Sequence, residues 1–479
     1  MPAILGANSV SGYEIKNSLR FEDGDEASLT KTYGSAGNRR TWSFSCWFKR
    51  AKLPDNTDNI ANKDVLFCAV NNDNNLRISD DRLQFYLYDG SADYGYITTA
   101  VVRDQSAWYH VLFVLDTTNS TANQRMRLYL NGTEIGNSRY QDYADPPENF
   151  QGVFNSAGAH SVGRAISNQE SDYYLADVNF VDGTALTPTS FAETDDNGNW
   201  IPIKYAGSYG SNGFFMEFKQ TGTSADASGK GADTSGNGNH FTPQNMTAED
   251  ITTDTPTNNF ATINPLNTFP ATPPTLSEGN LQCRTVNADP GYFGGSGTIG
   301  VSTGKWYFEV KPTVTTSGQP FFIGVSYEPE EMARQGATAS AQYLAPTYLY
   351  YGHNGNKFNN GSNSSYGDSY AADDIVGVAL DLDNHKLYFS KNGTFQNSGD
   401  PTTGSTGTGS AFNLTTGKTY FPVLADGGGS VTTYQLNFGS PPFAISSGNT
   451  DAEGFGNFEF AVPSGYFALC SKNLAEYGG

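Results

Sequence analysis

Cysteine and histidine, the side chains that most often bind transition metals or carry redox chemistry, are scarce in this sequence. Its 479 residues include 4 cysteines and 5 histidines. No two cysteines form a C-x-x-C pair, and neither an H-x-H nor an H-E-x-x-H motif occurs. The sequence therefore gives no support to a structural zinc site, a zinc hydrolase or a dithiol redox site.

The cysteines that are present lie in strand-like surroundings. Cys46 stands in the alternating run TWSFSCWFKR, and Cys68 stands in VLFCAV. Because a free cysteine behaves as a small hydrophobic residue, we expect both to be buried in strands rather than joined in disulfides.

Long hydrophobic runs and clusters of positive charge are also missing. No stretch approaches the roughly 18 apolar residues that span a membrane, and the N-terminus MPAILGANSV lacks the basic and apolar regions of a signal peptide. We therefore expect a soluble, unprocessed chain with no membrane insertion. The formal net charge is -21 and the pI about 4.5. Nucleic acid is not an expected partner, because binding to phosphates needs clustered lysine and arginine.

The residues that are abundant favour β-structure. The chain has 53 glycines, 28 tyrosines and 31 phenylalanines, a composition typical of many short strands joined by turns. Two alternating hairpins stand out. The first, at 107–135, has two strands closed by a polar loop and a further turn at Asn131-Gly132, and the second, at 374–395, has turns at 383–384 and 392–393. The sequence predicts an all-β fold with two antiparallel β-sandwich domains in tandem and little helix.

The run at 41–50 predicts how the first sandwich is layered. Trp42, Phe44, Cys46 and Phe48 alternate onto one face of a strand, whereas Trp47 points to the other face. An indole on the second face predicts that both faces of this strand are covered.

Both halves resemble known families of concanavalin A-like jelly rolls. In the first half, the pattern W-x-H-V followed by Asp and L-Y-x-N-G at 108–132, the run SVGRA at 161–165 and YYLADVNFVDGTALTPTSF at 173–191 resemble laminin-G-like domains. In the second half, GKWYFEVK, FFIGVSYE, the hairpin at 374–395, YFPVLAD, YQLNFGSPPF and PSGYFALC resemble a SPRY (B30.2) domain in the same order. Both resemblances imply binding modules.

A composition change marks the junction between the two halves. We expect a laminin-G-like sandwich at 1–245, a Pro-, Thr- and Asn-rich junction at 246–280 and a SPRY-like sandwich at 281–479. Within the second domain, the low-complexity segment 399–410 predicts a mobile, exposed loop.

Catalytic patterns are not found. Some concanavalin-type folds are glycoside hydrolases that carry E-x-D-x-x-E on one strand, where alternate carboxylates face the sugar. The acidic runs EDGDE at 22–26 and ETDD at 193–196 lack this spacing and lie among turn residues, so they are interpreted as solvated loop charge. No G-x-S-x-G elbow stands between a strand and a helix. The prediction is a protein that is not an enzyme.

Three segments rich in tyrosine and in amide or acidic residues suit carbohydrate, at 89–96, 168–174 and 343–370. Aromatic faces stack on sugar C–H groups, and amides and carboxylates bind hydroxyls. The alternative is that the tyrosines fill sheet faces and the amides form turns. The candidate glycan contacts, expected on loops at the ends of the sandwiches, are Asp93, Tyr94, Tyr96, Asp172, Tyr173, Tyr348, Tyr350, Tyr351, Asn354 and Tyr366.

The laminin-G-like resemblance also implies a structural calcium ion. Asp73, Asp116 and Asp177 are the candidate ligands, because calcium prefers carboxylate and carbonyl oxygens. No other cofactor is expected.

A combination of segments indicates where the protein acts. The N-terminal run at 21–50, DTSGNGNHFTPQN, DTPTNNFATINPL and a C-terminal SPRY-like domain together resemble structural proteins of bacteriophages, particularly marine ones. This resemblance implies a virion-surface protein assembled in the host cytoplasm, either a tail fibre or tailspike component or a capsid decoration or fibre protein.

The partners that this role implies are other virion proteins, further copies of the chain, as a trimer if it forms a fibre, and a host-surface glycan or receptor. The alternatives are a glycoside hydrolase that depolymerises surface polysaccharide and a purely structural spacer.

Overall fold

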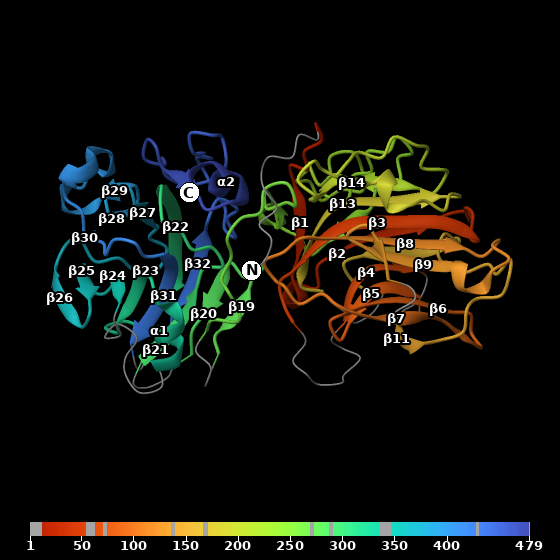
Figure 1. Ribbon diagram of the computed structural model, residues 1–479, viewed down its shortest axis with the longest axis horizontal. Helices are drawn as coiled ribbons and strands as arrows, with labels where there is room; N and C mark the ends of the chain where they lie inside the picture. Colours follow the sequence, from red (N-terminus) through yellow and green to blue (C-terminus); the bar gives the residue numbers. More distant parts are fainter. Residues whose placement is uncertain are drawn as a thin grey trace. The chain divides into compact units, whose positions relative to one another are not determined.

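The computed structural model describes residues 12–53, 63–69, 74–135, 139–165, 171–268, 273–286, 291–335, 346–427 and 431–478. The chain divides into two compact units, of which unit 1 ends at Thr257 and unit 2 begins at Asn258. The division falls inside the Pro- and Thr-rich stretch at 246–280. Each unit is built from two large, mainly antiparallel sheets (Figure 1), which confirms the predicted all-β fold class.

Unit 1 contains two eight-stranded sheets. Sheet A has the order β10-β9-β8-β3-β13-β1-β18, with β16 also paired to β13. Its strands are β1 (Ser18–Phe21), β3 (Thr41–Arg50), β8 (Tyr109–Asp116), β9 (Met126–Leu130), β10 (Thr133–Glu134), β13 (Tyr173–Asp182), β16 (Phe214–Met216) and β18 (Ile251–Thr252).

Sheet B has the order β11-β7-β6-β5-β4-β12-β2-β17. Its strands are β2 (Ser28–Tyr33), β4 (Lys63–Ala69), β5 (Asn75–Ser79), β6 (Arg82–Tyr88), β7 (Asp93–Val101), β11 (Arg139–Asp142), β12 (Gly158–Val162) and β17 (Thr242–Gln244). A separate two-stranded sheet joins β14 (Ala192–Thr194) and β15 (Trp200–Pro202). In Figure 1, β5, β6, β7 and β11 lie together below β3, β8 and β9.

The core of unit 1 forms between the two sheets. Trp42, Phe44, Cys46 and Phe48 of β3 all point into it, as their alternation predicts. Trp47 lies in a second cluster on the other side of sheet A. Segments after β13 cover that side, so the prediction that both faces of this strand are covered is confirmed.

Histidine and cysteine side chains in these sheets are structural. His110 of β8 is buried, its Nε2 lies 2.8 Å from Ser45 Oγ, and its Nδ1 accepts a hydrogen bond from Trp200 Nε1 at 3.1 Å. Burial lowers the pKa of His110 to about 3. The two cysteines in strands β3 and β4 are buried and free, as expected.

Unit 2 contains a nine-stranded and a six-stranded sheet. The first has the order β19-β20-β32-β22-β27-β28-β29, with β30 on β28 and β33 on β22, and the second has the order β21-β31-β23-β24-β25-β26. The strands of the first are β19 (Thr275–Ser277), β20 (Gln282–Arg284), β22 (Lys305–Val314), β27 (Val376–Asp381), β28 (Lys386–Lys391), β29 (Thr394–Phe395), β30 (Phe412–Asn413), β32 (Thr433–Asn437) and β33 (Phe467–Ala468). Those of the second are β21 (Gly291–Ser296), β23 (Phe321–Ser326), β24 (Thr347–Tyr351), β25 (Asn356–Asn359), β26 (Ser362–Ser365) and β31 (Phe421–Gly427). Trp306 is fully buried in the core between them.

Helices are short. The described residues form two α-helices, α1 (Pro329–Gln335) and α2 (Ser471–Tyr477), and several 3-10 turns: η1 (Asp23–Asp25), η2 (Ala122–Gln124), η3 (Pro188–Ser190), η4 (Ala248–Asp250), η6 (Gln396–Ser398) and η7 (Pro401–Thr406). Neither α-helix has the length or the apolar run needed to cross a membrane.

The segment 399–410, predicted as a mobile, exposed loop, contains η7. The Asp400 carboxylate accepts a hydrogen bond from the backbone N–H of Thr402, and Pro401 is buried. The low-complexity segment thus includes a capped turn with a buried proline.

Candidate functional site

The outer face of sheet B carries polar and aromatic side chains on neighbouring strands. In β6, every second side chain is buried in the core, so Gln84 and Tyr86 point to the opposite face. The register pairs Gln84 with Arg77 of β5 and Tyr86 with Gly95 of β7. We define the sheet-B face as Arg77, Gln84, Tyr86, Asp93 and Tyr143.

Direct contacts join these five side chains. Arg77 Nε donates a hydrogen bond to Gln84 Oε1 at 2.6 Å, and the Arg77 guanidinium lies 5.2 Å from the centre of the Tyr86 ring. The ring centres of Tyr86 and Tyr143 are 5.6 Å apart in an edge-to-face arrangement. The Tyr86 hydroxyl donates to Asp93 Oδ1. The side chains thus form one connected patch rather than isolated surface groups.

The backbone at Gly95 brings Tyr143 to this patch. Gly95 has a φ of +124°, and a Cβ there would lie 1.9 Å from the carbonyl oxygen of Phe85. The Tyr143 N–H donates to the Gly95 carbonyl at 3.0 Å, and the Gly95 N–H donates to the Ala144 carbonyl at 3.2 Å. A glycine is therefore required where the segment after β11 crosses β7.

The patch combines a rigid base with an accessible edge. Gln84 and Arg77 are buried, whereas Tyr86 and Tyr143 are half-buried and Asp93 is exposed. Aromatic rings whose orientation is fixed lose little entropy when a ligand stacks on them. Asp93 supplies acceptors and the tyrosine hydroxyls supply donors at the rim.

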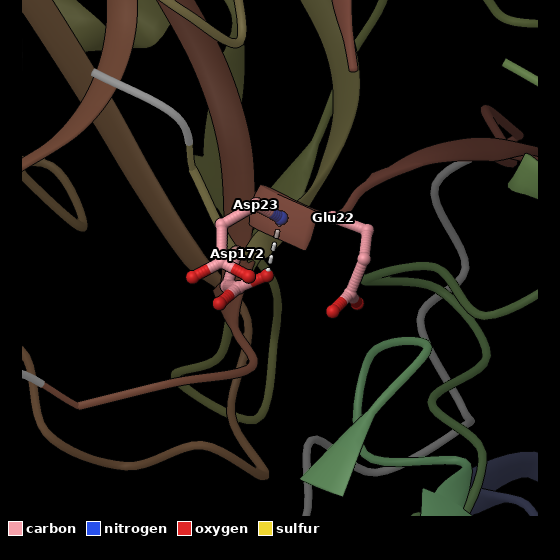
Figure 2. Close-up of side chains that lie close together, drawn as sticks. All are labelled: Glu22, Asp23 and Asp172. Carbon is pink, nitrogen blue, oxygen red and sulfur yellow. Dashed lines mark hydrogen bonds between the residues drawn. The ribbon is translucent and has the colours of Figure 1, made fainter. Parts of the chain in front are cut away.

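A second group brings three carboxylates together at η1. Glu22, Asp23 and Asp172 each place a carboxylate oxygen within 4.8 Å of the others. Figure 2 shows the carboxylates of Asp23 and Asp172 side by side and that of Glu22 extending beside them. The Asp23 N–H donates to Asp172 Oδ1 at 2.8 Å. Lys52 Nζ lies 2.5 Å from Asp23 Oδ2 and 3.5 Å from Asp172 Oδ2.

The neighbouring carboxylates of this cluster affect the ionisation of Asp172. Burial, followed by repulsion from Glu22 and Asp23, raises the pKa of Asp172 to about 8. Three carboxylates match calcium in kind. The Lys52 ammonium, however, already contacts two of them, so the arrangement is a charge cluster that ties the loops of this end together.

Two family models match the chain. The model of the Concanavalin A-like lectin/glucanases superfamily matches residues 22–190, within unit 1, and the SPRY domain model matches residues 305–440, within unit 2. The chain carries a concanavalin A-like domain followed by a SPRY domain. No curated protein matches the chain.

Solved structures resemble parts of the chain at low identity. The SPRY domain of human HERC1 is 15% identical, with 32% of this chain and 92% of that chain covered and a TM-score of 0.24. A heptameric SAP-like pentraxin from Limulus polyphemus is 14% identical, covering 37% and 80%, with a TM-score of 0.27. A putative carbohydrate binding protein from Bacteroides ovatus is 15% identical, covering 48% and 59%, with a TM-score of 0.32.

Several predicted contacts of the concanavalin A-like domain lie in strands, which corrects their placement on loops. Tyr94 and Tyr96 of β7 and Tyr173 of β13 point into the core, where alternate positions of these strands are buried. Asp172 is buried in the charge cluster described above. Asp93 is the exposed one of these five residues and belongs to the sheet-B face.

The predicted contacts of the SPRY domain divide in the same way. Tyr348 and Tyr350 of β24 and the nearby Tyr366 are buried in the core, which again corrects a loop placement. Tyr351 is half-buried and stacks on Phe322 at 4.7 Å between ring centres. Tyr351 and the exposed Asn354 flank the turn between β24 and β25, and their contacts with a glycan stay predictions.

Asp116 and Asp177, the two predicted calcium ligands that the structure describes, do not belong to its group of close carboxylates. Asp116 ends β8 and accepts hydrogen bonds from the N–H and Oγ1 of Thr118. Asp177 is buried on β13, where its Oδ2 accepts a hydrogen bond from the Tyr13 hydroxyl at 2.7 Å. Asp73 lies outside the described residues. Among the residues that the structure describes, the group of three close carboxylates is instead the one at η1.

Tyr86, Gln84 and Arg77 were not among the predicted contacts, although the sequence carries a signal for the first two. In LQFYLYDG at 83–90, apolar and polar side chains alternate, which is typical of a strand with one face exposed. The polar positions of that strand are therefore the ones that the pattern predicts to be exposed and available for binding. Tyr143 had no such signal, since its position depends on how the segment at 143–144 pairs with Gly95.

Proposed function

We propose that this protein is a non-enzymatic binding protein that attaches to a surface glycan through the sheet-B face of its concanavalin A-like domain. The observation that carries the proposal is the connected patch of Tyr86, Tyr143 and Asp93 on the outer face of sheet B. Partly exposed aromatic rings with polar groups at their rim match the apolar and hydroxyl faces of a sugar ring.

The geometry assigns a role to each side chain of the patch. The Tyr86 ring would carry the C–H face of a sugar, and Tyr143, which meets it edge to face at 5.6 Å, would border that ring. Asp93 would accept hydrogen bonds from sugar hydroxyls. Arg77, held by Gln84 at 2.6 Å, keeps the Tyr86 ring in place from beneath. The turn with Tyr351 and Asn354 in the SPRY domain is a second contact in the same proposal.

Replacing Tyr86 by alanine is expected to weaken glycan binding by about 1 to 3 kcal/mol, roughly five- to 150-fold, as for anchor residues in other interfaces. The measurement is retention of the purified protein on immobilised envelope polysaccharide of the host.

Tyr205→Ala provides the matched control, because Tyr205 is also a half-buried tyrosine but packs against the covered outer side of sheet A. Both variants remove a half-buried ring, so we expect them to have similar stability. If only Tyr86→Ala then binds the glycan more weakly, the proposal is supported. If both variants bind the glycan equally well, the sheet-B face is not the glycan-binding surface.

The proposal includes a location on the surface of a bacteriophage virion, with other virion proteins and further copies of this chain as partners. What supports it is the resemblance of the N-terminal run at 21–50 and the segments at 233–245 and 254–266 to phage structural proteins. Repetition of a weak site raises avidity, which favours an oligomer, a trimer in a fibre. Peptides of this chain in purified particles and a trimer mass in light scattering are the expected results; a monomer absent from particles would contradict both.

The rival function is a polysaccharide-depolymerising hydrolase. The carboxylate cluster at η1 is where it would be sought, because Asp172 has a pKa raised to about 8 beside Asp23 and Glu22. A general acid and a nearby carboxylate base form the usual glycosidase pair. In this cluster, however, Asp172 is buried and accepts a backbone hydrogen bond, which favours a structural role.

A further inference from the structure

Seven asparagines of the chain are followed directly by glycine, the pair most prone to spontaneous loss of the side-chain amide. In this reaction the backbone nitrogen of the glycine attacks Cγ of the asparagine, and glycine has no side chain that obstructs the attack. The reaction requires an amide group that can turn toward the backbone and a glycine nitrogen that is free to attack. The asparagines are Asn131, Asn197, Asn212, Asn237, Asn354, Asn360 and Asn392.

Hydrogen bonds restrain the four pairs that lie outside the two-residue hairpin turns. In two of them the side-chain amide donates to a backbone carbonyl, and in the other two the glycine N–H does so. The bonds join Asn212 Nδ2 to the carbonyl oxygen of Ser35 (3.0 Å), Asn237 Nδ2 to that of Gly210 (2.6 Å), the Gly198 N–H to that of Asp195 (3.0 Å) and the Gly355 N–H to that of Tyr351 (3.0 Å). Each bond holds one of the two groups that would have to react.

The other three pairs form two-residue hairpin turns with nearly the same backbone. In each turn both residues have a positive φ, of 46° to 49° at the asparagine and 74° to 81° at the glycine. Asn131 Oδ1 accepts a hydrogen bond from the His110 N–H at 2.8 Å. Asn392 Oδ1 accepts one from the Ile375 N–H at 2.8 Å, and its Nδ2 donates to Asp374 Oδ1 at 2.7 Å. Two of the three turns therefore hold their asparagine side chain in place.

The third turn, Asn360-Gly361, lacks such restraints. Asn360 is exposed, and neither its side chain nor the Gly361 N–H makes a hydrogen bond with any residue that the structure describes. The turn joins β25 to β26, the last strand of its sheet, and all four residues of β26 are exposed. Local opening of an edge hairpin with few buried contacts costs less free energy than opening in the middle of a sheet.

We propose that Asn360 is a site of spontaneous covalent modification, at which the side-chain amide is lost and a carboxylate is gained. The Gly361 nitrogen forms a bond to Cγ of Asn360, the bond from Cγ to the amide nitrogen breaks, and ammonia leaves with the proton of the Gly361 N–H. Water then opens the resulting succinimide at either carbonyl and gives aspartate or isoaspartate. The net change is the uptake of one water molecule and the release of one ammonia molecule.

This modification would change both the charge and the backbone of the hairpin. Each conversion adds one negative charge, and isoaspartate inserts a methylene group into the backbone of a turn that requires positive φ at both residues. The SPRY domain should therefore become heterogeneous with age at this turn, whether or not the sheet-B face binds a glycan.

Peptide mapping by mass spectrometry tests the proposal on the full-length protein after incubation at mildly alkaline pH, where the Gly361 N–H loses its proton more readily. Fragment spectra assign each conversion to one asparagine. In the folded protein, Asn360 is expected to convert at least about tenfold faster than Asn131 and Asn392, which share its turn. Asn360→Gln should remove this product and leave the other pairs unchanged, because the longer side chain of glutamine forms a cyclic imide much more slowly.

The same protein unfolded in urea is the control, because it keeps the sequence and loses the hydrogen bonds. There the seven pairs are expected to convert at similar rates. Equal rates for Asn360, Asn131 and Asn392 in the folded protein would overturn the proposal, as would faster conversion at any other pair. An equally large excess at Asn360 in urea would also overturn it, because the neighbouring sequence rather than the fold would then select this asparagine.

Discussion

Replacing Trp42 by alanine is expected to destabilise the concanavalin A-like domain by about 3–5 kcal/mol, the usual cost of emptying a large aromatic site in a core. The Trp42 side chain is fully buried, and the rings of Phe85, Phe154 and Phe180 lie 5.2 to 5.8 Å from it between centres. The measurement is differential scanning calorimetry of the whole chain. The transition of this domain should fall by roughly 10 °C.

Two further variants control this result. Trp42→Phe should cost less, because it keeps an aromatic ring and removes an indole N–H that has no hydrogen-bond partner among the described residues. Trp306→Ala should instead lower the transition of the SPRY domain, whose core contains that side chain. Since the two units have separate cores, a Trp42→Ala variant in which both transitions fall equally would contradict independent folding.

The concanavalin A-like domain is expected to lose stability as the pH rises from about 4 to about 8. Burial raises the pKa of Asp177 to about 7, with repulsion from Glu217 adding to it and the Tyr13 hydroxyl, Lys204 and Lys219 opposing it. An aspartate in the unfolded chain ionises near about 3.9. Between these values the unfolded state releases a proton that the folded state keeps, so stability is present at low pH and is lost as the pH rises through the folded pKa.

The size of this effect is large for one side chain. A shift of three pKa units corresponds to on the order of 4 kcal/mol for Asp177, and Asp172, whose pKa is raised to about 8, acts in the same direction. Asp177→Asn should therefore melt at a higher temperature than wild type at pH 8 and at a similar temperature at pH 4.

Asp89→Asn is the control, because hydrogen bonds from the backbone N–H groups of Ala92 and Ser91 lower the pKa of Asp89 to about 2. A carboxylate with a lowered pKa is ionised in both states above pH 5, so the slope between pH 5 and 8 should not change. Identical slopes for wild type and Asp177→Asn would contradict the raised pKa of Asp177.

The strand pattern and the layers were predictable because burial alternates along a strand. The run at 41–50 shows this, since its even positions up to Phe48 fill the core and Trp47 lies on the covered outer side. The bulge on β13 shows the limit: the register jumps between Ala176 and Asn179 and puts Asp177 at a φ of 48°. No sequence pattern near Asp177 indicates the extra residue of the bulge. The burial of Asp177 could therefore not be predicted.

The candidate site was harder to predict, because tyrosine serves both cores and binding surfaces. The segment DGSADYGY at 89–96 has the composition of a turn, yet β7 begins at Asp93, and Tyr94 and Tyr96 therefore alternate into the core. The cluster at η1 joins Asp23 to Asp172, 149 positions apart, and depends on the pairing of β1 with β13. Pairing between strands so distant in sequence cannot be derived from local patterns.

Incubation of the purified protein with size-defined host envelope polysaccharide tests the central claim most directly. Mass-resolved chromatography of the mixture reports both retention and chain length. The account predicts saturable retention that is lost in Tyr86→Ala, with polysaccharide chains of unchanged length. Polysaccharide chains that are shortened by wild type and by Tyr86→Ala, but not by Asp172→Asn, would contradict the account and identify a hydrolase. If the polysaccharide is neither retained nor shortened, the account is also contradicted, and the protein is a structural spacer.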